Sequence, residues 1–164
     1  MNNVCRELAE RIRGEVPDLA RLIHRALRSW SHGRQLSGEQ EVYLESVALN
    51  LHGFYSGLER LFELIARHVD RIVPAGEGWH HDLLQRMANE VTETRPAVIS
   101  PESASMLDEL RRFRHLVRHV YAFNLSSERM EPLITTLPGL WQQAQAELSA
   151  FADFLDEISQ VGPA

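Results

Sequence analysis

Residues 43–69 read YLESVALNLHGFYSGLERLFELIARHV. Apolar side chains recur in this stretch at the three- and four-residue spacing of an α-helix, and they wrap most of its circumference. A helix that is apolar on nearly every side must be surrounded by other elements, so we expect it to be the central helix of the protein. Gly53 and Gly57 each cost about 1 kcal/mol in helix propensity. This pair predicts that another helix approaches closely.

The rest of the chain also favours helices, because β-branched residues are sparse and never alternate over a strand length. A capping box at Ser37-Gly38-Glu39-Gln40 and the pair Ser100-Pro101 mark two helix starts. We predict an all-α fold, an antiparallel bundle of four to five helices that forms a single domain over residues 1–164. We expect five helical stretches. The first covers residues 3–31 and is continuous or divided at Pro17, and the second runs from the capping box to about residue 73. The others cover about 79–91, 101 to about 123, and about 128–159 with an interruption at Pro138-Gly139.

The composition and net charge of the chain exclude several classes of function. The chain has 164 residues, with 17 basic side chains that are all arginine, 23 acidic ones and a net charge of −6. Non-specific binding to DNA or to an anionic membrane needs an excess of cations, so neither partner is expected. The single Cys5 excludes an intrachain disulfide and a thiolate zinc site, and the uncharged stretch 132–146 is too short to span a membrane. The many charges in the first thirty residues do not fit a secretory signal, so we expect a cytoplasmic protein without metal or cofactor.

The helix expected over residues 101–123 carries a dense basic cluster. Its apolar residues lie on one side, so the cluster is expected to form a broad cationic face turned outward from the bundle. Like charges stacked on a helix repel each other, so this face predicts a bound anion or an acidic partner, unless it is simply solvated. The cluster consists of Arg111, Arg112, Arg114, His115, Arg118 and His119.

Arg114, His119 and Tyr121 have the spacing R-x4-H-x-Y. This pattern resembles the motif of the HEPN superfamily, and the surrounding residues 113–125 are similar to those of its HepT-like ribonuclease toxins. Residues 43–60, followed by Trp79-His80-His81-Asp82-Leu83-Leu84, are similar to the second helix and the start of the third helix of that group. The resemblance therefore covers residues 43–123 and implies a HEPN-like helical domain.

The resemblance implies a metal-independent endoribonuclease, the toxin of a bacterial toxin–antitoxin pair. The imidazole of His119 can move the proton of an RNA 2′-hydroxyl, and the guanidinium of Arg114 can clamp the scissile phosphate. Arg111, His115 and Arg118 are expected to bind the RNA substrate. By the same resemblance, Tyr121 is the residue to which a nucleotidyltransferase antitoxin attaches AMP, which would fill and neutralise the site.

Residues five apart on a helix diverge by about 140°, so Arg114 and His119 of one chain do not converge. We therefore predict a twofold homodimer in which two copies of this helix line one groove. The alternative is a non-catalytic helical module that binds a nucleotidyltransferase or a nucleotide.

Several other polar residues have mainly structural interpretations. Asn50, His52 and Glu59 either support the groove from below or fill hydrogen-bonded core positions. The adjacent His80 and His81 project about 100° apart, so they are poor joint metal ligands.

Overall fold

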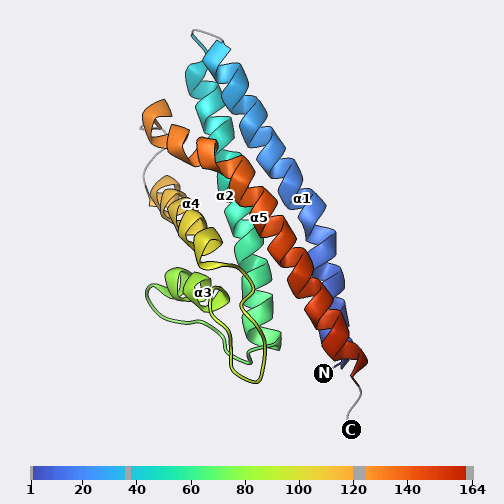
Figure 1. Cartoon of the computed structure of the whole chain (residues 1–164). Coiled ribbons are helices and arrows are strands. Elements are labelled where there is room, and N and C mark those ends of the chain that lie inside the picture. The colour runs from blue at the N-terminus through green and yellow to red at the C-terminus, as the bar shows by residue number, and fades with distance from the viewer. Residues whose placement is uncertain (1, 36–37, 120–124, 162–164) are drawn as a thin grey trace.

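The computed structural model describes residues 2–35, 38–119 and 125–161, and this part of the chain contains five α-helices. Helix α1 packs against α2 and α5, while α3 and α4 pack on α2 and against each other (Figure 1). The predicted all-α bundle is confirmed. No helix in the described ranges is both long and apolar enough to cross a membrane. The helices are α1 (Asn2–Gln35), α2 (Gln40–His68), α3 (Trp79–Met87), α4 (Pro101–His119) and α5 (Ser127–Gln160).

Helix α2 is the central helix, as its sequence predicts. It contacts α1, α3 and α4, and its Phe54 ring also meets Trp141 of α5. Each fully buried large apolar side chain contributes about 1.5–3 kcal/mol. Gly57 faces α1 so closely that an added Cβ would lie 2.9 Å from Cδ2 of Leu19. At Gly53 the same atom would lie 3.6 Å from Leu22, an ordinary contact. The predicted close approach of a second helix is therefore confirmed, most clearly at Gly57.

Three helix ends differ from the predicted ones. α1 runs through Pro17 to Gln35, past the expected end near residue 31. α2 ends at His68 rather than near residue 73, because Arg71 adopts the left-handed conformation (φ 59°) and the N–H of Ile72 bonds back to the carbonyl of Ala66 at 2.9 Å. α3 ends at Met87 rather than near residue 91, and the carbonyl of Met87 accepts from the N–H of Val98 at 2.8 Å.

The two predicted helix starts have different outcomes. Ser100 caps α4 as expected, since its hydroxyl accepts from the N–H of Ser103 at 3.1 Å. α2 instead begins at Gln40 with Glu39 at its N-cap, and Glu39 makes no side-chain capping bond. Ser37, and the expected end of the α4 helix at residues 120–123, lie outside the described residues.

The predicted interruption of the last helix at Pro138-Gly139 is wrong, because α5 continues through it. Pro138 has no N–H to donate to the carbonyl of Ile134, and its ring crowds that carbonyl. Figure 1 shows a bend rather than a break in the first, orange third of α5, which contains Pro132 as well as Pro138.

A buried ion pair organises the segments around α3. The carboxylate of Asp70 accepts from Nε and Nη2 of Arg95 at 2.6 and 2.9 Å and from Nε of Arg86 at 2.6 Å. The side chains of Asp70 and Arg95 are both 0% exposed. Arg95 donates further to the carbonyls of Asn89 and Pro96 at 3.1 and 3.0 Å. One guanidinium thus joins the end of α2 to the loop between α3 and α4.

We expect Arg95→Met to lower the free energy of unfolding by about 3–5 kcal/mol, because the buried carboxylate of Asp70 loses two of its three arginine donors and keeps only Arg86, while the carbonyls of Asn89 and Pro96 lose the donor from Arg95. The matched control is Arg13→Met, since Arg13 also contacts two carboxylates, Asp153 at 2.7 Å and Asp156 at 2.6 Å, but at an exposed position. Its effect should be much smaller. Chemical denaturation followed by circular dichroism measures both, and equal losses of stability would contradict the assignment.

Candidate functional site

Glu59 lies on α2 at the junction with α3 and α4, and its side chain is only 4% exposed. Each oxygen of its carboxylate has a cationic or imidazole partner from a different helix. Oε1 accepts from Nη1 of Arg114 on α4 at 2.9 Å, and Oε2 lies 2.8 Å from Nδ1 of His80 on α3. A buried carboxylate requires such partners, so Glu59 connects the three helices.

Arg114 points inward, which corrects the expectation that it belongs to an outward cationic face. Its side chain is 13% exposed, and its guanidinium carbon lies 5.9 Å from the centre of the Tyr55 ring. On the helix, Arg114 continues the apolar stripe of Leu107 and Leu110, so α4 packs it against α2. Nε of Arg114 is buried and has no hydrogen-bond partner among the described residues.

The Tyr55 hydroxyl beside this guanidinium is also buried and has no hydrogen-bond partner in the described ranges. Burial raises the pKa of this hydroxyl well above its ordinary value, and the nearby carboxylate of Glu59 raises it further. Tyr55 therefore stays neutral and offers Arg114 an aromatic face rather than a negative charge.

Arg111 and Arg112 of α4 are partly neutralised by acidic residues one turn earlier. Nε of Arg111 donates to Asp108 at 2.7 Å, and Arg112 contacts Asp108 at 2.9 Å and Glu109 at 3.9 Å. Repulsion between Arg111 and Arg112 is therefore reduced without an external partner, and the predicted bound anion or acidic partner stays a prediction. Pairs three and four residues apart on a helix supply the compensation locally.

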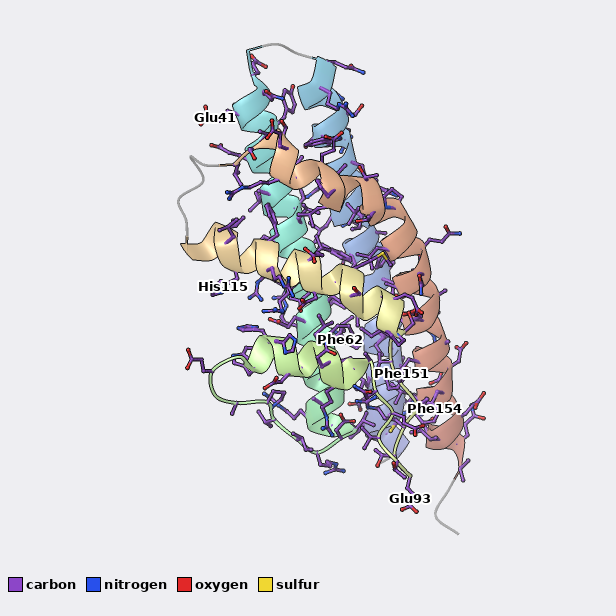
Figure 2. The ribbon with its side chains drawn as sticks, turned by 60° about the vertical axis from the view of Figure 1, so that its left-hand side comes forward. Glu41, Phe62, Glu93, His115, Phe151 and Phe154 are labelled. Carbon is purple, nitrogen blue, oxygen red and sulfur yellow. The ribbon has the colours of Figure 1, made fainter. Side chains whose placement is uncertain are left out.

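Four cationic or imidazole side chains nevertheless meet at one small cavity of about 30 Å³, the size of a single water molecule. Its lining residues are His80, Arg111, Arg114 and His115. Figure 2 shows α3 and α4 side by side, with His115 on the edge of α4 that faces α3. We call these four residues the basic cavity. Because every lining side chain can carry positive charge, the cavity suits an anionic group at its mouth.

Three of the predicted site residues, Arg111, Arg114 and His115, are thus brought together. Arg118 and His119 belong to the last turn of α4, but their side chains lie outside the described part of the structure. Tyr121 lies outside the described residues altogether. The roles of these three residues stay predictions.

His80 was not predicted as a member of this site. A signal for it existed, since His80 stands three and four residues before the buried Leu83 and Leu84 and so belongs to the inner stripe of α3. Glu59 fills a buried, hydrogen-bonded position, and both of its partners line the basic cavity. Asn50 also fills a core position, because its amide donates to the carbonyl of Ser46 at 2.8 Å.

A distant cavity of about 250 Å³ lies between α1, α2 and the start of α5 and contains none of the predicted site residues. It is lined by neutral polar and apolar groups such as Trp30 and Tyr43, with Arg34 and Glu131 of opposite charge. Among the residues that the structure describes, no cluster of three or more His, Cys, Asp or Glu side chains could hold a metal ion.

Comparison with known proteins supports the resemblance seen in the sequence. Residues 46–155, about two thirds of the chain, match the family described as HepT-like protein. No curated protein and no solved structure matches the chain. The matched range includes the central helix, the basic cavity and the R-x4-H-x-Y motif. The chain is therefore a HepT-like protein of the HEPN superfamily.

Proposed function

We propose that this chain is a cytoplasmic, metal-independent endoribonuclease toxin that cleaves RNA in the groove of a homodimer. The observation that carries the proposal is the basic cavity, in which Arg114 and His115 of the motif helix meet Arg111 and His80. The HepT-like family and the R-x4-H-x-Y spacing support the same conclusion. RNA, rather than DNA, is the substrate because the chemistry uses the 2′-hydroxyl as nucleophile.

In this proposal Arg114 binds the scissile phosphate. A guanidinium has five N–H donors, so the bond from Nη1 to Glu59 leaves others for phosphate oxygens. Its anchoring by Glu59 and its contact with the Tyr55 ring preorganise it, so little side-chain entropy is lost when the phosphate binds. Arg111, His115 and Arg118 contribute further phosphate contacts.

His119 is the proposed acid–base residue. In its neutral form it accepts the proton of the 2′-hydroxyl as that oxygen attacks phosphorus, and the imidazolium can return a proton to the leaving 5′-oxygen. The products are a 2′,3′-cyclic phosphate and a 5′-hydroxyl. Arg114 stabilises the negative charge that builds on the phosphate oxygens in the transition state.

We expect the purified protein to cleave single-stranded RNA in the presence of EDTA and to leave DNA intact. His119→Ala should lower the rate about 10²–10⁴-fold, and Arg114→Lys about 10²–10³-fold. Lysine keeps a positive charge for Glu59 but loses the planar fork, so the fold should survive. Gel analysis of a labelled oligonucleotide measures cleavage and the cyclic phosphate end.

The control for this experiment is Arg112→Ala, because Arg112 lies on the same helix with its side chain 65% exposed and does not line the basic cavity. Its rate should match that of the wild type. Unchanged cleavage by His119→Ala would refute the assignment of His119. A folded wild type that binds a nucleotidyltransferase but never cleaves RNA would favour the non-catalytic module.

The homodimer generates a prediction of its own. If Arg114 of one chain acts with His119 of its partner, a mixed dimer of Arg114→Lys and His119→Ala chains contains one intact site. Mixing the two inactive variants under conditions of subunit exchange should therefore restore cleavage, measured with the same oligonucleotide. Activity of a strictly monomeric form, or failure of exchanged dimers to regain activity, would contradict the composite site.

The proposed antitoxin is a nucleotidyltransferase that attaches AMP to Tyr121. The added phosphate would occupy the anion site and neutralise its arginines, which explains inhibition without a conformational change. Intact-mass spectrometry after co-expression with a nucleotidyltransferase encoded beside this chain should show added AMP. Tyr121→Phe should abolish the addition and keep RNA cleavage active, whereas AMP found on another residue would overturn the assignment.

A further inference from the structure

His80 is held on two sides. Its Nδ1 lies 2.8 Å from Oε2 of the buried Glu59, and its ring stacks on the ring of Trp79 with centroids 3.7 Å apart and planes 28° apart. Because an ionised carboxylate only accepts hydrogen bonds, Nδ1 must carry the proton of this contact. The other ring nitrogen, Nε2, is then the one left to contact a bound group.

The charges around His80 favour an anion. One oxygen of Glu59 faces Arg114 and the other faces Nδ1 of His80. A phosphate oxygen only accepts hydrogen bonds, so it binds His80 as an imidazolium, with Nδ1 donating to Glu59 and Nε2 donating to the phosphate. The charged and titratable groups that share the basic cavity with His80 come from α4 and are Arg111, Arg114 and His115. The side chain of His80 is 31% exposed, which makes part of its ring accessible from solvent.

We propose that His80 is a further RNA-binding residue, which presents Nε2 to a backbone phosphate beside Arg114 while Glu59 positions both side chains. The inference rests on the proposed ribonuclease function and deepens it, since it adds a helix outside the R-x4-H-x-Y motif to the site. Glu59 is a positioning residue in this arrangement, because it contacts Arg114 and His80 rather than the RNA.

The substitution His80→Asn tests the role of Nε2 alone. An asparagine amide can occupy the position of Nδ1 and donate to Glu59, but it has no group at the position of Nε2. His80→Gln does the opposite, because its longer side chain places the amide near the position of Nε2. His81→Asn is the matched control, since His81 is the next residue of α3, is 48% exposed, contacts Asp82 at 3.5 Å and does not line the basic cavity.

Two measurements on the full-length protein separate the outcomes. The first is the dissociation constant for a single-stranded 2′-O-methyl oligonucleotide, which binds but cannot be cleaved, and the second is kcat/KM for the matching RNA. We expect His80→Asn to weaken binding of the analogue about tenfold or more, as for the loss of one charge-assisted hydrogen bond. His80→Gln should keep more of the affinity, and His81→Asn should bind like the wild type.

The inference is overturned if His80→Asn binds and cleaves like the wild type, whatever His80→Gln does, because His80 would then only hold Glu59. It is also overturned if His81→Asn loses as much affinity as His80→Asn. If the wild type and His80→Asn bind the analogue equally well, the inference about His80 fails but the proposed ribonuclease function does not. A wild type that neither binds nor cleaves refutes the proposed function and this inference together. Thermal unfolding confirms that each variant is folded.

Discussion

The arrangement of α3 and α4 on the central helix depends on the buried carboxylate of Glu59. Taking a carboxylate out of water costs several kcal/mol unless its partners are well placed, and here each oxygen has one. Those partners are Arg114 and His80, which come from two different helices. A shift of α4 along α2 would separate the buried carboxylate from its guanidinium, and a shift of α3 would remove its imidazole partner. The constraint therefore positions the motif arginine through the central helix, rather than through its own helix alone.

The distribution of ion pairs explains how a protein with a net negative charge can offer an anion site. Much of the positive charge is compensated nearby, by Asp108 and Glu109 on α4 and by Asp70 for Arg95. What distinguishes the basic cavity is convergence, because two guanidinium groups and two imidazoles face one space the size of a water molecule. The local arrangement of these side chains, rather than the net charge of the protein, makes the site suitable for an anion. The buried Nε of Arg114 has no hydrogen-bond partner among the described residues.

The fold was largely predictable because helices follow from short-range periodicity. Helix α2 was identified by its apolar circumference, Gly57 by its spacing from Gly53, and the start of α4 by Ser100 before Pro101. Helix ends were harder to predict, because they depend on backbone conformations that cannot be inferred from the residue type. Arg71 ends α2 in the left-handed conformation without a glycine, and α5 accommodates Pro138 by bending. The buried pair of Asp70 and Arg95 was not foreseen, since it joins residues 25 positions apart.

By itself, the sequence determined the all-α class, the central helix and the HepT-like family, because periodicity and a spaced motif are local properties of the chain. The tertiary structure alone decided which way Arg114 faces and which residues join it. A helical wheel places Arg114 at the border between polar and apolar faces, and the carboxylate of Glu59, 55 positions earlier, holds the side chain on the inner side. His80 enters the site for the same reason: its partner lies on another helix, at a distance that no local pattern encodes.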